Sequence, residues 1–94
     1  MNAANRAKAR YTIINRLGLH ARAAAQLVKL ASTFPCEITV GHDGQTANAK
    51  SVMGVLLLCG APGTVLDIEA VGERATDAVS QIGTLIENRF GEPD

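Results

Sequence analysis

The order of its hydrophobic patterns constrains the fold of this chain more than any other feature. Segments with an apolar residue at every second position, typical of half-buried strands, alternate with segments whose apolar residues recur at helical spacing. The strand-like segments are residues 10–15, 36–40, 46–49 and 64–71, and the helix-like segments are 21–33, 51–58 and 73–88. Because each strand is apolar on one face only, the sequence predicts an α+β open-faced sandwich of order βαββαβα. Its four-stranded, mainly antiparallel sheet would carry three helices on one face.

Length and composition fit one domain. Ninety-four residues can bury a single hydrophobic core, and 47% of them are hydrophobic. We expect this domain over residues 10–90, with a disordered lead-in over residues 1–9 and a flexible tail over residues 91–94. The N-terminal segment lacks the apolar stretch of a signal peptide, and the longest apolar run is too short to span a membrane. We therefore expect a cytoplasmic monomer without direct membrane insertion.

The cysteines and histidines do not form a recognised metal or disulfide pattern. Cys36 and Cys59 are too few and too far apart for a disulfide framework, so we expect reduced, mostly buried thiols. A zinc site built from them with His20 and His42 would lack the usual ligand spacing. We therefore expect no metal and no cofactor, and we assign no role to His42.

Charge is distributed unevenly along the chain. Residues 1–50 hold seven Lys or Arg and two Asp or Glu, whereas residues 51–94 hold two and seven, so a net charge of zero conceals halves of +5 and −5. A basic half can attract an anionic substrate or an acidic partner. It would also suit nucleic acid, but the chain has only three aromatic residues for base stacking. A small nucleic-acid-binding module therefore stays the less favoured alternative, and we expect no nucleic-acid partner.

One stretch, "NRLGLHARAAAQ" over residues 15–26, places a histidine at the entrance of the first predicted helix. Helices usually begin with Ser, Thr, Asp or Asn, and His20 is a poor choice for a cap. The helix N-terminus, with Arg16 and Arg22, favours a neutral imidazole that keeps a nucleophilic lone pair. A phosphoryl group on the ring would meet backbone N–H groups and the Arg22 guanidinium. The stretch therefore predicts a phosphate carrier.

A second stretch, "AKSVMGVLLL" over residues 49–58, predicts a short apolar helix opened by Ser51. Serine is a preferred N-cap residue, and that structural role is one interpretation of Ser51. The apolar residues cannot all face inward on a helix of about two turns. We therefore expect an exposed apolar surface near Ser51 that includes Val52 and Met53 and contacts a partner.

The two motifs "LGLHARAAAQLVKLA" and "AKSVMGVLLL" closely resemble the HPr family, the histidine phosphocarriers of the bacterial phosphoenolpyruvate-dependent phosphotransferase system. The resemblance runs from about residue 10 to residue 88 and implies that the single domain is HPr-like. It implies that His20 accepts a phosphoryl group from phosphorylated enzyme I and passes it to an enzyme IIA domain, with Arg22 stabilising the anion. It also implies that Ser51 is a regulatory serine for HPr kinase/phosphorylase, and that Val52 and Met53 belong to a docking surface. Arg16 is expected to contribute to partner binding.

The chain departs from the family's usual His-x-Arg-Pro pattern at Ala23, which stands at the proline position. Alanine is the best helix former, so we expect the helix to persist, while a less rigid first turn would affect the rate of transfer. A regulatory HPr-like protein that no longer transfers phosphate is an alternative, because it would keep the fold and Ser51. Retention of both His20 and Arg22 favours the carrier.

Overall fold

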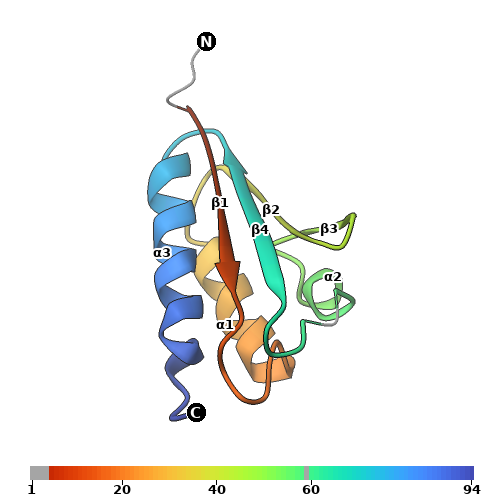
Figure 1. Cartoon of the computed structure of the whole chain (residues 1–94). Coiled ribbons are helices and arrows are strands. Elements are labelled where there is room, and N and C mark those ends of the chain that lie inside the picture. Colours follow the sequence, from red (N-terminus) through yellow and green to blue (C-terminus); the bar gives the residue numbers. More distant parts are fainter. Residues whose placement is uncertain (1–4, 59) are drawn as a thin grey trace.

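The computed structural model describes residues 5–58 and 60–94 and shows the predicted order of strands and helices (Figure 1). A short 3₁₀ turn follows the last helix. The elements are β1 (Arg6–Thr12), α1 (Ala21–Ala31), β2 (Glu37–His42), β3 (Gln45–Asn48), α2 (Val52–Leu56), β4 (Val65–Val71), α3 (Ala75–Glu87) and the 3₁₀ turn (Arg89–Gly91).

The four strands form one sheet in the order β1-β4-β2-β3, and every neighbouring pair is antiparallel. In β4, alternate residues are buried, as the sequence pattern predicts for a strand with one covered face. The helices lie on that one face, so the α+β open-faced sandwich is confirmed (Figure 1). The core between the layers is almost entirely aliphatic; its largest fully buried hydrophobic side chains include Ile13, Leu27, Ile38, Leu66, Ile68, Ile82, Ile86 and Phe90.

The longest helix, α3, lies unusually close to β1 because one of its residues has no side chain. A Cβ at Gly83 would lie 2.1 Å from Cζ of Tyr11, so only glycine leaves room for the ring. The Tyr11 hydroxyl donates a hydrogen bond of 3.3 Å to the carbonyl of Val79, one turn earlier in the helix. This contact fixes where α3 crosses the sheet and therefore where the chain after α3 arrives.

The first strand begins earlier than the sequence pattern indicates, and the expected disordered lead-in over residues 1–9 is wrong from Arg6 onward. Arg6 pairs with Val71 at the far end of β4, and the ladder continues without a break to Thr12. The segment is rich in alanine and basic residues, which favour strands weakly, so local propensity gives no signal. Pairing with the buried strand β4 supplies the order that propensity lacks. Residues 1–4 lie outside the described part of the chain.

Residues 91–94, for which we expect a flexible tail, make specific contacts in the structure. The 3₁₀ turn buries Phe90 in the core, with 1% of its surface exposed, and thereby directs the following residues back across the molecule. The N–H of Arg16 then donates to the carbonyl of Asp94 at 3.0 Å. The buried Phe90 and this hydrogen bond place residues 91–94 against the loop that follows β1.

The described residues include no helix that is long and apolar enough to cross a membrane. They also bring together no group of three or more His, Cys, Asp or Glu side chains able to hold a metal ion. The thiol of Cys36 is free and buried. Cys59, for which we expected a reduced and mostly buried thiol, lies outside the described residues.

Candidate functional site

The loop that leads into α1 is held tightly against the segment before β4. The N–H of Leu19 donates to the carbonyl of Gly60 at 2.7 Å. Gly18, next to it, has φ of +69°, and a Cβ there would lie 2.5 Å from the same carbonyl oxygen. Glycine is required at this position, both for its left-handed backbone and for the close approach. These contacts therefore fix the position of the loop that carries His20 at the start of α1.

His20 is the N-cap of α1, as predicted, but its side chain caps nothing. Its backbone is extended (φ −80°, ψ 179°), and its carbonyl accepts from the N–H of Ala24 at 2.8 Å. The imidazole makes no hydrogen bond to the free N–H groups of the first turn. The ring is thus available for other chemistry, and those N–H groups remain donors for an anion.

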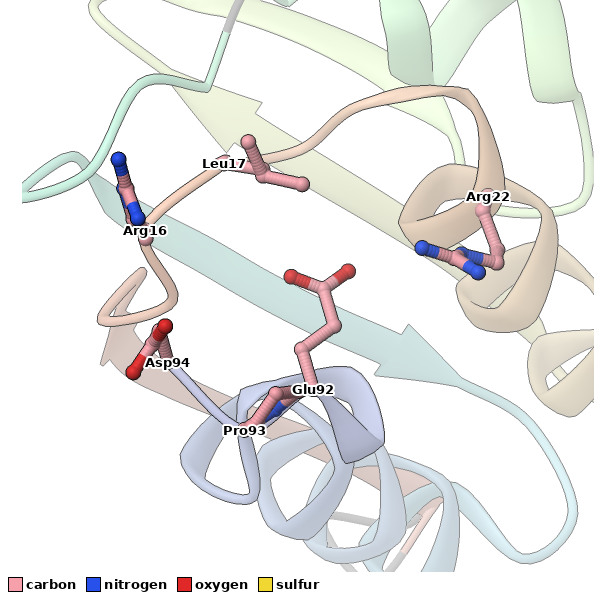
Figure 2. Close-up of a pocket in the computed structure, with 6 residues that line it drawn as sticks. All are labelled: Arg16, Leu17, Arg22, Glu92, Pro93 and Asp94. Atoms are coloured by element: carbon pink, nitrogen blue, oxygen red, sulfur yellow. The ribbon is translucent and has the colours of Figure 1, made fainter.

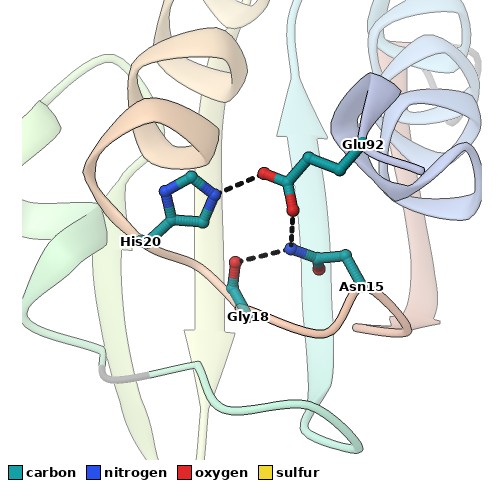
Figure 3. Close-up of polar contacts among 4 residues, drawn as sticks. All are labelled: Asn15, Gly18, His20 and Glu92. Atoms are coloured by element: carbon teal, nitrogen blue, oxygen red, sulfur yellow. Dashed lines mark hydrogen bonds and ion pairs between the residues drawn. The ribbon is translucent and has the colours of Figure 1, made fainter. Parts of the chain in front are cut away.

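The imidazole instead contacts a carboxylate from the other end of the chain. Nε2 of His20 forms a hydrogen bond with Oε2 of Glu92 (Figure 3). Nδ2 of Asn15, a fully buried residue, donates to Oε1 of Glu92 at 3.0 Å and to the carbonyl of Gly18 at 2.8 Å. Hydrogen bonds from His20 and then from Asn15 hold the pKa of Glu92 below its ordinary value. Glu92 is therefore an ionised acceptor.

This carboxylate changes the charge balance expected around the ring. The sequence shows only Arg16, Arg22 and the helix N-terminus near His20, all of them positive. The structure adds Glu92, which is 72 positions away in the chain. The surroundings of the imidazole are therefore mixed in charge, because an acidic group joins the basic groups that the sequence places nearby.

A pocket of about 230 Å³ opens beside this cluster, and its lining joins the predicted basic residues to the C-terminal segment. It is lined by Arg16, Leu17, Arg22, Glu92, Pro93 and Asp94. Figure 2 shows the Arg22 guanidinium from α1 and the Glu92 carboxylate both directed into this pocket. The structure thus brings the predicted phosphate-stabilising arginine and the predicted docking arginine to one place next to His20.

The predicted docking surface lies on α2, which packs against α1. Val52 and Met53 are 39% and 68% exposed, and Leu57, which the sequence did not single out, is 69% exposed. Oγ of Ser51 accepts a hydrogen bond of 3.1 Å from the N–H of Gly54. Ser51 is therefore the N-cap of α2, and the structural interpretation of this serine is confirmed.

Ala23 lies in the first turn of α1 and is fully buried. The helix runs without interruption from Ala21 to Ala31, so a helix without the usual proline does form here. The expectation that the helix persists is confirmed.

Two residues of the site were missed by sequence reasoning. Asn15 begins the stretch that marks His20, yet its amide resembles any polar loop residue until its contacts are seen. Glu92 follows the last patterned helix and carries no motif. A pattern could not have found it, because its role depends on where the turn after α3 directs the chain.

The fold and the site together define a class of protein: a small two-layer domain with a partly exposed histidine at a helix N-terminus, close to an arginine-lined pocket, and with exposed apolar side chains on α2. Comparison with known proteins makes the assignment specific. The family model "PTS HPr component phosphorylation site" matches residues 7–88. The phosphocarrier protein HPr of Xylella fastidiosa strain Temecula1 is 46% identical over 81 residues, which are 86% of this chain and 91% of that protein.

Solved structures agree with this match. HPr from Thermoanaerobacter tengcongensis aligns with a TM-score of 0.90 at 39% identity and covers 94% of this chain and 99% of its own. A structure of an HPr dimer from the same organism has a TM-score of 0.74 at 42% identity, covering 85% and 92%. The chain belongs to the HPr family of phosphocarriers of the phosphotransferase system.

Proposed function

We propose that His20 accepts the phosphoryl group from phosphorylated enzyme I and donates it to an enzyme IIA domain. Membership in the phosphocarrier family supports this assignment. The main structural support is the position of the imidazole, which lies at the N-terminus of α1 but makes no capping hydrogen bond to it. A ring in that position can carry an anion where backbone N–H groups are free to bind it.

The geometry also indicates which ring nitrogen reacts. Nε2 of His20 is engaged by the Glu92 carboxylate, which accepts hydrogen bonds and donates none. The proton of the neutral ring therefore belongs on Nε2, and the lone pair belongs on Nδ1. Nδ1 attacks phosphorus, and the bond between phosphorus and the donor breaks with its electron pair leaving on the donor.

Arg22 stabilises the transferred group. Its guanidinium points into the pocket beside His20, where it can form charge-assisted hydrogen bonds with phosphoryl oxygens. Arg16 lines the same pocket and can attract an acidic partner to it. The exposed side chains of Val52 and Met53 provide apolar area for the partner to bury.

Regulation through Ser51 is a further part of the proposal. A phosphate on this hydroxyl, added by HPr kinase/phosphorylase, would bring about −1.5 to −2 charges to the start of α2. That charge would stand beside Val52 and Met53 and would oppose an acidic partner. Docking would weaken while the core, which Ser51 does not enter, would stay intact.

We place this activity in the cytoplasm and in the monomer, with enzyme I and enzyme IIA domains binding in turn to the same surface. The two partners bind in turn because a single imidazole must meet each of them directly. Sedimentation at micromolar concentration tests the monomer, and a dimer at the working concentration would contradict it.

The deciding experiment is labelling of the purified protein with phosphoenolpyruvate and enzyme I, followed by mapping of the modified residue. We expect one acid-labile phosphoryl group on His20 and none on the His20→Ala variant, with His42→Ala labelled normally as the matched control. Labelling of His20→Ala to the same stoichiometry would show that the assignment is wrong. A wild-type protein that is never labelled, yet is modified on Ser51 by the kinase, would be a regulatory HPr-like protein instead.

A further inference from the structure

The contact between His20 and Glu92 joins the reactive ring to a segment outside the part of the chain that matches the family model, which ends at residue 88. We propose that Glu92 is a positioning residue for His20. It holds the ring in the tautomer with the proton on Nε2, and it stabilises the positive charge that the ring gains when Nδ1 takes the phosphoryl group. This inference rests on the proposed function of His20.

The cluster is built to hold the carboxylate in place. The side chains of His20 and Glu92 are 25% and 11% exposed, so the carboxylate is largely removed from water. Asn15, which is fully buried, donates one hydrogen bond to Glu92 and a second to the backbone of Gly18. The amide therefore connects the carboxylate to the loop that positions His20, and the three side chains form one hydrogen-bonded chain (Figure 3).

The backbone after α3 is shaped to deliver Glu92 to the ring. Phe90 is buried in the core although its φ of 54° is in the left-handed region, which a bulky residue rarely adopts. Gly91, the next residue, also has a positive φ, of 78°. This reversal sends Glu92 toward His20 instead of continuing the direction of α3.

During phosphoryl transfer, the Glu92 carboxylate would stabilise the charge that develops on the imidazole. When the Nδ1–phosphorus bond forms, the imidazole keeps its proton on Nε2 and becomes positively charged. A carboxylate on that N–H stabilises the cation, as the carboxylate of a Ser-His-Asp triad does for its imidazolium. No proton moves to Glu92. When the acceptor takes the phosphoryl group, the Nδ1–phosphorus bond breaks, its electron pair returns to Nδ1 and the ring becomes neutral again.

Ring ¹⁵N spectroscopy of the free protein tests the positioning directly. Histidine-labelled wild type is compared with Glu92→Ala, with Glu92→Asp as the conservative variant and with Glu87→Ala as an exposed control at the end of α3. We expect the His20 signals of wild type and Glu87→Ala to report a proton on Nε2. Glu92→Ala should show a mixture of tautomers, and Glu92→Asp should recover most of the wild-type pattern.

The rate of labelling by enzyme I is measured on the same four proteins, with urea unfolding to correct for any unfolded fraction. We expect Glu92→Ala to be slower by about tenfold, the low end of the range seen when a histidine that binds a metal loses the carboxylate that orients it, since the ring is partly exposed here. Glu92→Asp should restore most of the rate. Unchanged ring signals in Glu92→Ala, or changed signals with an unchanged rate, would overturn the proposal.

The two measurements separate this inference from the proposed function. The ring signals are recorded without a phosphoryl donor, so they decide the tautomer even if enzyme I does not label His20. Absence of labelling in the wild type would contradict the proposed function and, with it, the role of Glu92 in transfer, whereas the assignment of the tautomer would be decided separately by the ring signals. Normal labelling of Glu92→Ala at His20 would leave the function standing and show that Glu92 has no part in it.

Discussion

Replacing Gly18 by alanine should damage both the stability of the domain and the position of the reactive ring. The residue has φ of +69°, and left-handed backbone costs a residue with a Cβ about 1–2 kcal/mol. The new Cβ would also lie 2.5 Å from the carbonyl oxygen of Gly60, a backbone atom that cannot rotate away. Overpacking of this kind costs about 1–3 kcal/mol, so we expect a total loss of about 2–5 kcal/mol in the free energy of unfolding.

Gly44→Ala is the matched control for this substitution. Gly44 also has a positive φ, of +81°, but nothing lies within 4 Å of its Cβ position, so only the backbone cost of about 1–2 kcal/mol applies. Urea unfolding of both variants, extrapolated linearly to water, isolates the clash as the difference between them. Phosphorylation of the folded fraction should also slow in Gly18→Ala, because Gly60 holds the residue before His20. Equal losses of stability in the two variants would refute the reasoning.

Four further substitutions, at three positions, extend these expectations. Arg22→Ala should slow labelling of His20 while leaving the melting temperature within a few degrees of wild type, because the side chain is exposed; a variant that unfolds but transfers normally would make Arg22 structural. Ser51→Ala should cost about 1 kcal/mol through loss of the cap on Gly54 and should transfer normally, whereas Ser51→Asp should transfer more slowly; equal rates would argue against the switch. The pKa of Glu92 is lowered by folding, so its contribution to stability is present above the pKa of an unfolded glutamate and is lost as the pH falls through the folded value. Wild type should therefore be more stable than Glu92→Gln at pH 7 and lose that advantage in acid, and a constant difference across this range would contradict the assignment.

The arrangement of strands and helices could be predicted because an element with one buried face has apolar residues at regular spacing in the sequence. Apolar residues alternate over residues 64–71 and recur at helical spacing over residues 75–86. The structure places a strand and a helix there, as expected. Residues 6–9 escaped prediction because they are ordered by pairing with β4 and not by their own preferences. Pairing partners that lie more than 50 positions away leave no local signal.

The residues of the candidate site also fall into two groups, those that the local sequence could indicate and those that it could not. His20, Arg22 and Ser51 could be singled out as candidates because each stands at or within two residues of a helix start, where residue type and position together have chemical meaning. Glu92 and Asn15 could not be identified, because their roles exist only once the chain end has returned to the loop after β1. Sequence reasoning therefore singled out the histidine and missed Glu92, which contacts it across the chain, and Asn15, which contacts Glu92.

The two layers place the candidate site and the exposed face of the sheet on opposite sides of the molecule, so substitutions on the two sides should have different effects. His20 and α2 belong to the helical side, whereas the outer face of the sheet carries exposed ion pairs such as Arg6 with Glu69 and Arg10 with Asp67. Exposed pairs of this kind contribute about 0–1 kcal/mol each, so exchanging or losing one leaves the fold in place. Substitutions should therefore be tolerated on this face more readily than around His20, where a substitution would disturb the hydrogen bonds of Glu92 and Asn15. Relatives that serve different relays can be expected to diverge first across the outer sheet, which makes that face the natural place to attach a probe without disturbing transfer.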